Sequence, residues 1–310
     1  MAAFGYTILR KFANLRSNLG GCRVHLGKAG ASGDVILSLR VFAPSRLLAP
    51  YVMAIWDYED LTGSDNSALS ILPDTASYLC FLYADFLQTT HKNAIYTTRS
   101  GLAGFQTYRS DLGGAGKISG VSARLTPWGL NVFRSGIVRD CAEKRVDCRD
   151  VFPRYAIERI EDRLSLMRTA EERVQCLESF LLSALNRNNE DLLIQKACKD
   201  LSSSNGNYPI WRLARNLGLT ERTLERRFLA HIGTTPKKYA RVVRLRNAVL
   251  QRKKLSAWAN VAQEAGYYDQ SHMIRDFQEL YGISPEALHP QIEVSQTIQF
   301  SGLLNLYQAA

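Results

Sequence analysis

An internal repeat in the C-terminal third of the chain constrains the fold most strongly. Residues 210–236 (IWRLARNLGLTERTLERRFLAHIGTTP) match residues 258–285 (WANVAQEAGYYDQSHMIRDFQELYGISP) in order. The matched positions lie 48 residues apart in the first part and 49 apart in the second, so one residue has been added between the two parts. A repeat of this kind predicts that one supersecondary unit occurs twice.

Each copy predicts two short helices joined by a sharp turn. Gly218 and its match Gly266 permit the turn, because glycine tolerates positive φ. Thr220 and its match Asp269 have side-chain oxygens that can cap the helix that follows. Apolar residues four positions apart then face inward in that helix. These inward pairs are Leu224 and Phe228 in the first copy, and Met273 and Phe277 in the second.

Residues 236–253, between the copies, predict one long helix. It begins with proline, which suits the first position of a helix. One side is apolar and the rest is strongly basic. Charge is concentrated in this part of the chain: residues 202–290 hold fourteen Lys and Arg against seven Asp and Glu, or +7 of the total of +10. A basic module beside a near-neutral one predicts a polyanionic partner.

This pattern resembles the DNA-binding domain of the AraC/XylS transcription regulators. The matching stretches are LARNLGLTERTLERRF, the G-x-T-P turn, Arg244-Leu245-Arg246-x-Ala248 and VAQEAGYYDQSHMIRDFQELYGISP. The resemblance covers about residues 190–290, with both copies, both turns and the linking helix in the same order. It implies a transcription regulator whose two helix-turn-helix units contact double-stranded DNA, without cofactor or metal.

The second helix of each unit is expected to enter the major groove, with the two helices about one DNA turn (~34 Å) apart. The resemblance makes the outward side chains near the start of each helix the base-reading candidates. They are Arg222, Glu225 and Arg226 in the first copy, and Gln270, Ser271, Ile274 and Arg275 in the second. The candidates for phosphate contact are Thr220, Lys237, Lys238, Arg241 and Lys254. For any single residue, phosphate contact or simple solvation is the alternative.

The N-terminal half predicts a different architecture. Short runs rich in β-formers, separated by Gly, Pro, Asp and Asn, favour an antiparallel sandwich or barrel. The runs are 34–42, 51–58, 70–72, 78–86, 95–98 and 117–125. Helical patterns take over from about residue 127, most clearly at 171–185 and 190–201. The apolar stripe of 171–185 has two interpretations, packing on its own domain or on a second copy of the chain.

The expected class is therefore α+β, with an N-terminal antiparallel β domain carrying helices and a C-terminal all-α double helix-turn-helix domain. The stretches LLAPYVMAIWDYED, ILPDTASYLCFLYADF and GVSARLTPWGL resemble the cupin-like sensor domain of some AraC/XylS regulators. The expected divisions are an arm (1–33), a sensor or dimerisation domain (34–186), a linker with the first helix of the DNA-binding domain (187–208), the double helix-turn-helix (209–290) and a tail (291–310).

The family resemblance implies that the N-terminal domain senses a small molecule or mediates dimerisation, and it allows RNA polymerase as a further partner. Six aromatic residues are candidates for lining a pocket, although ordinary core packing is the favoured interpretation. They are Trp56, Tyr58, Tyr78, Phe81, Tyr83 and Phe86. His25 and His91 lack partners at ligand spacing, so no metal site is expected. The six cysteines form no C-x-x-C pair and are expected to be reduced, mostly buried thiols.

Two other classes of protein remain alternatives. A DNA-linked enzyme of the alkylation-repair type would need a reactive cysteine beside histidine or a cysteine cluster for zinc, and neither is visible. No other catalytic constellation occurs, so no enzyme activity is predicted. A non-specific nucleic-acid binder would not need the acidic side chains at the reading positions. We expect no membrane contact and a bacterial cytoplasmic location, because no signal or membrane-spanning run is found. The operator, the effector, the oligomeric state and the choice between activation and repression stay open.

Overall fold

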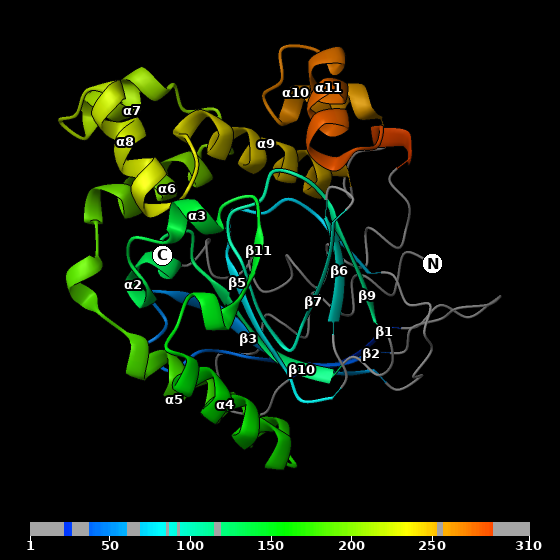
Figure 1. Cartoon of the computed structure of the whole chain (residues 1–310). Coiled ribbons are helices and arrows are strands. Elements are labelled where there is room, and N and C mark those ends of the chain that lie inside the picture. The colour runs from blue at the N-terminus through cyan, green and yellow to red at the C-terminus, as the bar shows by residue number, and fades with distance from the viewer. Residues whose placement is uncertain are drawn as a thin grey trace.

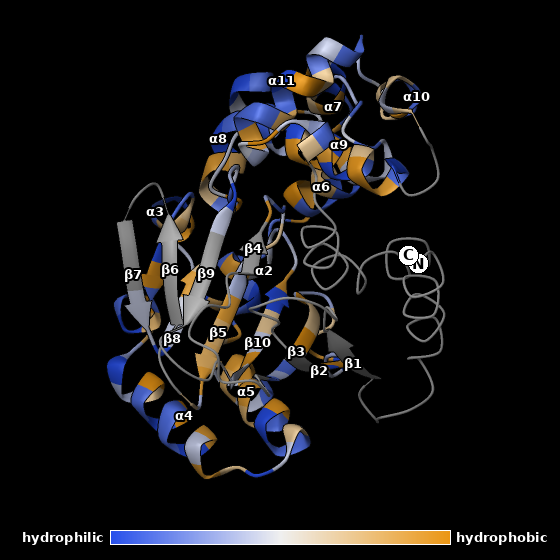
Figure 2. Cartoon of the chain, turned by 90° about the vertical axis from the view of Figure 1, so that its right-hand side faces the viewer, coloured by the Kyte–Doolittle hydropathy of each residue, from blue (hydrophilic) through white to orange (hydrophobic). Residues whose placement is uncertain are grey.

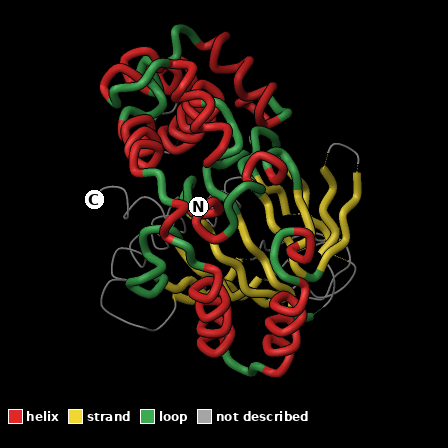
Figure 3. Tube along the Cα trace, turned by 60° about the vertical axis from the view of Figure 1, so that its left-hand side comes forward, coloured by secondary structure: helices red, strands yellow, loops and turns green. Residues whose placement is uncertain are grey.

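The computed structural model describes residues 22–26, 37–60, 69–84, 87–91, 94–114, 119–252 and 257–287. Within these ranges an N-terminal region of β-sheet carries a group of helices on top, and two further helices lie below the sheet (Figures 1 and 3). No helix in the described residues is long and apolar enough to cross a membrane.

Two antiparallel sheets form the N-terminal region. The larger has the order β1-β2-β3-β10-β5-β8-β11, and the smaller has the order β4-β9-β6-β7. The strands of the larger sheet are β1 (Cys22–Leu26), β2 (Leu37–Phe42), β3 (Val52–Asp60), β10 (Ser119–Leu125), β5 (Tyr78–Leu82), β8 (Ser100–Ala103) and β11 (Arg145–Asp147). Those of the smaller are β4 (Leu69–Ile71), β9 (Ser110–Gly114), β6 (Leu87–His91) and β7 (Ala94–Thr98). The antiparallel β architecture expected from the sequence is confirmed.

Helices α4 (Arg154–Leu166) and α5 (Ala170–Ala184) lie on one side of the larger sheet, and the smaller sheet lies on the other (Figure 1). The apolar stripe of α5 packs against the sheet of its own domain, which decides between the two interpretations given above. Phe180, for example, meets Phe81 of β5 edge to face, with ring centroids 5.5 Å apart. Figure 2 shows the hydrophobic residues of β5 and β10 in the interior.

Several strands and the helix α4 were not predicted from the sequence. β8 (SGLA) and β9 (SDLGG) are rich in glycine and small residues, so neither shows an alternating pattern. The amphipathic helix α4 was also missed, although Ile157, Ile160 and Leu164 follow the spacing of a buried helix face and are buried here.

The expected arm over residues 1–33 does not extend over Cys22–Leu26, which belong to the larger sheet. These five residues form β1, which pairs with β2 from Cys22↔Val41 to Leu26↔Leu37. Their backbone groups are satisfied by the edge of the sheet, a contact that no local sequence pattern reveals. The rest of the arm and the tail 291–310 lie outside the described residues, and so does Phe86.

The cysteines whose side chains are described are free thiols. Four of them are buried, and Cys80 is half-buried. Burial raises the pKa of Cys141 to about 11, where Asp140 adds to the effect of desolvation. This agrees with the expectation of reduced, mostly buried cysteines.

The C-terminal region is entirely helical. Short elements connect it to the sheets: α2 (Gly129–Phe133), α3 (Val138–Cys141) and the 3-10 turns η1 (Cys148–Asp150) and η2 (Arg187–Asn189). The helices proper are α6 (Leu192–Ser203), α7 (Ile210–Asn216), α8 (Glu221–His231), α9 (Pro236–Arg252), α10 (Trp258–Glu264) and α11 (Gln270–Tyr281), followed by η3 (Pro285–Ala287). The predicted linking helix corresponds to α9, which separates α7 and α8 from α10 and α11 (Figure 1).

Candidate nucleic-acid interface

The two sequence copies fold into two matching helix-turn-helix units. The first helices, α7 and α10, have seven residues each and begin at Ile210 and Trp258. The second helices, α8 and α11, begin at Glu221 and Gln270. The starts are 48 and 49 residues apart, so the added residue lies in the second turn, as the alignment of the copies predicted.

The turn and cap residues take the predicted roles. Gly218 and Gly266 adopt φ of +69° and +77°, in the left-handed region where a side chain is strained. The Thr220 hydroxyl accepts a hydrogen bond from the Thr223 backbone N–H at 3.2 Å, and the Asp269 carboxylate accepts one from the His272 N–H at 2.7 Å. The local sequence therefore sets both the turn and the start of each reading helix.

The reading helices separate buried from outward residues as expected. The inward residues Leu224, Phe228, Met273 and Phe277 are fully buried. On α8, the side chains of Arg222, Glu225 and Arg226 are exposed. On α11, Ser271 and Arg275 are exposed, whereas Gln270 and Ile274 are half-buried. The outward set on α8 mixes two cations with one carboxylate.

The candidates for phosphate contact differ among themselves. Lys237 and Lys238 are exposed at the start of α9. The Thr220 side chain is also exposed, and its hydroxyl donates to Thr223 Oγ1 at 2.9 Å in addition to capping α8. The Arg241 guanidinium is engaged within the protein by Asp276 and Glu279. Lys254 lies outside the described residues.

Ion pairs fix the second unit to α9. Arg241 Nη2 lies 2.7 Å from an oxygen of the buried carboxylate of Asp276, and it also pairs with Glu279 on α11. The hydrogen bond to Glu279, with a contribution from Asp276, raises the pKa of Arg241. Arg244 donates from Nη2 to the Gly206 carbonyl at 3.0 Å and lies over the Tyr267 ring. The predicted phosphate contact Arg241 therefore positions α11.

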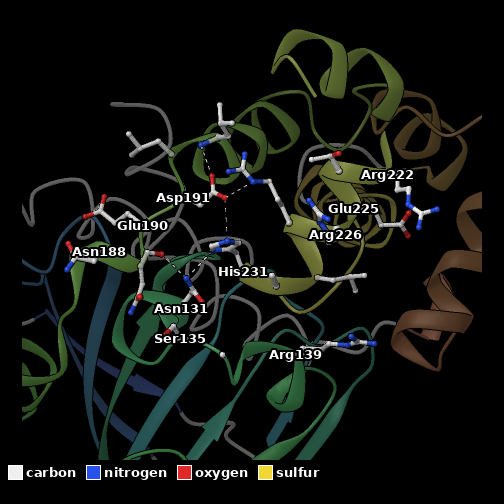
Figure 4. A pocket seen from close by; sticks show the side chains of 18 residues that line it. Asn131, Ser135, Arg139, Asn188, Glu190, Asp191, Arg222, Glu225, Arg226 and His231 are labelled. Atoms are coloured by element: carbon white, nitrogen blue, oxygen red, sulfur yellow. Dashed lines mark hydrogen bonds and ion pairs between the residues drawn. The ribbon is translucent and has the colours of Figure 1, made fainter. Parts of the chain in front are cut away.

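The first unit instead meets the N-terminal region directly. At Gly233, which follows α8, a Cβ atom would come within 2.8 Å of the Val138 carbonyl oxygen on α3, so only glycine allows this approach. Beside this contact lies an open hollow of about 1210 Å³. It is lined by the candidate base-reading residues Arg222, Glu225 and Arg226 and by Arg139 of α3 (Figure 4).

Arg139 lines this hollow beside the candidate interface, and the sequence did not point to it. It is an exposed cation more than eighty residues before α8 in the chain, within a segment that shows no DNA-binding pattern. Only the packing of α3 against α8 brings it to the hollow that the reading residues line (Figure 4).

A polar cluster at the end of α8 joins the same two regions. Asn131 donates from Nδ2 to the Asn189 carbonyl at 2.8 Å and lies 3.0 Å from His231 Nδ1. The other ring nitrogen of His231 lies 3.4 Å from Asp191 Oδ2, which also pairs with Arg227 at 3.2 Å. Burial lowers the pKa of His231; Asp191 opposes this shift and Arg227 adds to it. A neutral ring that accepts from Asn131 and donates to Asp191 fits both contacts.

Two helix-turn-helix units in tandem, each with an outward polar face on its second helix, define a DNA-binding protein of the double helix-turn-helix class. A family model described as a helix-turn-helix domain matches residues 213–290. The chain is a transcription regulator with an AraC-type helix-turn-helix domain.

Similarity to solved structures is distant. ToxT from Vibrio cholerae O395 is 12% identical, with a TM-score of 0.42 over 74% of this chain and 94% of that one. The unsaturated fatty acid-bound ToxT from V. cholerae strain SCE256 is 14% identical, with a TM-score of 0.41 over 74% and 92%. The AraC-like transcriptional activator CuxR is 14% identical, with a TM-score of 0.23 over 74% and 80%. No curated protein matches the chain.

Proposed function

We propose that this regulator recognises a specific operator by placing α8 and α11 in two successive major grooves on one side of the duplex. The observation that supports this is the pair of matching units whose reading helices expose polar side chains and whose linking helix is continuous. With 17 residues, α9 spans about 25 Å, a length comparable to the ~34 Å of one DNA turn, which supports this placement of the two helices that it links.

The outward residues supply distinct chemistry for base recognition. Arg222 and Arg226 can each donate two hydrogen bonds to guanine, and Glu225 can accept one from cytosine N4. On α11, Gln270 can read adenine and Ile274 can contact a thymine methyl group, while Ser271 and Arg275 add hydrogen bonds. Lys237, Lys238 and Thr220 are proposed to hold the phosphate backbone.

Glu225 favours sequence-specific over non-specific binding. A carboxylate placed between two arginines on a DNA-facing helix repels phosphate, so it weakens binding that depends on the backbone charge alone. Its presence is favourable only where a base-edge donor meets it. This argues against a general nucleic-acid binder.

The test begins with operator selection from a random duplex library, followed by fluorescence anisotropy across salt concentrations. The selected duplex is expected to bind at least ~10³-fold more tightly than random DNA. Arg222→Ala, Arg226→Ala and Arg275→Ala should each weaken operator binding by about 5- to 150-fold and relax the preference at one base pair. Lys237→Ala should weaken all duplexes alike and reduce the salt slope by about one.

Arg159→Ala is the matched control, because Arg159 is an exposed arginine on α4, on the other side of the sheet from the interface. It should leave operator affinity unchanged. Equal affinity for selected and random DNA, or unchanged affinity after combined alanine substitution at Arg222, Arg226, Gln270 and Arg275, would show that these helices do not read bases.

The N-terminal domain is proposed to control DNA binding through a small molecule or through association with a second copy. Direct packing of α3 on the end of α8, and the contact between Asp74 and Arg246 of α9 at 3.5 Å, support this coupling. A change in the sheets would move the surfaces on which both helices rest. In this proposal the protein is a non-enzymatic regulator and works in the cytoplasm, where its DNA target lies.

A further inference from the structure

The open hollow beside α8 is bordered by the N-terminal region as well as by α8 itself. Ser135, Gly136 and Arg139 line it from α3 and the segment before α3, and Asn188 lines it from η2. The candidate base-reading residues of α8 line the same space (Figure 4). A surface of the N-terminal region and the outward face of α8 are therefore neighbours.

Arg139 is directed like the outward residues of α8. In Figure 4 its side chain extends in the same direction as those of Arg222 and Glu225. Its side chain is exposed, as are those of Arg134 and Ser135 shortly before it in the chain. A duplex that meets the outward face of α8 would therefore also approach this part of the N-terminal region.

The carboxylates that the N-terminal side and the start of α6 bring to the hollow are already engaged. Asp191 Oδ2 lies 3.2 Å from Arg227 Nε, and it also lies near His231. Glu190 pairs with Arg187 at 2.9 Å. The negative charge of these two side chains is thus balanced within the protein.

The remaining charges of the hollow are mostly positive. Arg139, Arg222 and Arg226 line it, and within the described ranges no carboxylate forms an ion pair with any of them. Glu225 is the one other carboxylate among the lining residues. Three unpaired guanidinium groups against one carboxylate favour a polyanion as the occupant of this space.

The position of α3 at the end of α8 corresponds to the rim of a major groove. With 11 residues, α8 is ~16 Å long, whereas the major groove is only about 12 Å wide. When the first turns of such a helix contact base edges, its C-terminal end lies near the rim, where a phosphate strand runs. α3 packs on that end, because a Cβ at Gly233 would come within 2.8 Å of the Val138 carbonyl oxygen.

The side chains at this rim are those that proteins use for phosphate. Arginine guanidinium groups, serine hydroxyls and asparagine amides supply many of the hydrogen bonds to phosphate oxygens in DNA complexes. Arg139, Ser135 and Asn188 carry these three groups and are exposed. Contacts of this kind hold the duplex without reading its sequence.

We propose that the N-terminal region is itself part of the DNA-binding surface, with Arg139 and Ser135 binding the phosphate strand that flanks the half-site read by α8. This inference deepens the proposed function and rests on it, because it requires α8 to lie in the major groove. It gives the N-terminal region a direct role in DNA binding in addition to the control proposed above.

The test uses the full-length protein and fluorescence anisotropy on the selected operator and on random duplexes across salt concentrations. Arg139→Ala should weaken binding to both kinds of DNA by the same factor, about 2- to 5-fold, and reduce the salt slope by about one. Arg139→Lys keeps the charge and should retain most of the affinity. Arg139→Glu should weaken binding more than Arg139→Ala, because a carboxylate repels the phosphate.

Lys144→Ala is the matched control, because Lys144 is an exposed cation of the same segment that does not line the hollow. This substitution removes the same charge and should leave the affinity unchanged. The Tm of all these variants should equal that of the wild type, since both side chains are exposed. A loss of affinity then reports on the contact and not on folding.

A scan with single methylphosphonate linkages, each of which neutralises one phosphate, locates the contact on the operator. At a phosphate beside the half-site of α8, neutralisation should weaken the wild type and leave the affinity of Arg139→Ala unchanged. This half-site is the one in which Arg222→Ala relaxes the base preference. Elsewhere on the operator, neutralisation should affect the two proteins equally.

The proposal is overturned if Arg139→Ala leaves the affinity unchanged, if Lys144→Ala weakens binding equally, or if no phosphate distinguishes the wild type from Arg139→Ala. Tighter binding by Arg139→Ala also overturns it, because α3 would then obstruct the duplex. A loss confined to the operator would assign Arg139 to base recognition instead.

Failure of this inference can be told apart from failure of the proposed function. If Arg222→Ala and Arg226→Ala weaken operator binding and Arg139→Ala does not, the reading helices act as proposed and only the contact at α3 is absent. If the combined alanine substitution in α8 and α11 leaves the affinity unchanged, the proposed function itself fails.

Discussion

The two helix-turn-helix units share one local design and differ in what holds them. In the second, Arg241 of α9 pairs with Asp276 and Glu279, so the anchor of α11 lies within the DNA-binding region. In the first, the end of α8 rests on α3, and His231 meets Asn131 of the N-terminal region. The comparison shows that a duplicated sequence can give equal units with unequal attachments, and that the end of α8 packs directly on the N-terminal region.

The largest effect is expected from two substitutions that test whether the two helix-turn-helix units differ in their coupling to the sheets. Phe228→Ala and Phe277→Ala each remove a fully buried ring and should cost about 3–5 kcal/mol. Phe228 packs on Tyr239, which stacks on Phe105 of the N-terminal region at 6.2 Å. Phe277 meets Trp258 and Tyr281 within its own unit. Hydrogen exchange should therefore show lost protection in the sheets only for Phe228→Ala.

Equal loss of protection in the sheets for both phenylalanine variants would mean that the molecule unfolds as one unit and that the difference in attachment has no energetic consequence. Leu166→Ala is a suitable control, because this leucine is 81% exposed at the end of α4 and its loss should change stability little.

An intermediate effect is expected from the anchor of the second unit. Arg241→Met leaves the buried carboxylate of Asp276 without its cation, which should cost about 2–4 kcal/mol. The pair with Glu279 contributes little, because that carboxylate is 63% exposed. Native-state hydrogen exchange should show reduced protection in α11 and unchanged protection in α8. Lys237→Met, which removes an exposed cation from the same helix, should leave both helices protected.

If Arg241→Met loosens α8 as much as α11, the two units share one anchor. Retained protection of α11 in this variant would show that the ion pairs do not hold that helix. Adding Asp276→Asn to Arg241→Met should recover part of the lost stability, since the uncompensated charge is then absent.

The smallest effect concerns the anchor of the first unit and is pH-dependent. Because burial lowers the pKa of His231 in the folded protein, the unfolded chain binds the proton first as pH falls. The contribution of His231 is fully present above about pH 6.5 and is lost as pH falls below that value toward the folded-state pKa. The change should stay within about 1 kcal/mol, the scale of one hydrogen bond.

His231→Gln retains hydrogen-bonding capacity without titrating in this range, so the acid-induced loss between pH 7.5 and 5.5 should be smaller than in the wild type. The measurement is chemical denaturation at each pH. If the stability of the wild type rises on acidification, or if the variant shows the same pH dependence, His231 does not stabilise the contact between α8 and the N-terminal region in the expected way.

The sequence by itself determined the helical units. The turn and cap residues act on neighbours only a few positions away in the chain, so a short stretch of sequence is enough to predict their roles. These residues are Gly218, Gly266, Thr220 and Asp269. The same locality explains why the outward positions of α8 could be predicted. Sequence patterns also indicated an antiparallel β domain, although the short strand β8 and the edge strand β1 were not predicted, because their stability comes from neighbouring strands.

Tertiary structure alone decided which distant side chains meet. Arg145, Tyr78 and Arg124 share a face because three separate strands pair in one register, and a shift of one residue would turn each side chain to the opposite face. Likewise, Arg139 reaches the hollow beside α8 through the packing of α3. Such contacts form only when long loops close and whole surfaces become buried. A local stretch of sequence cannot predict either of these events.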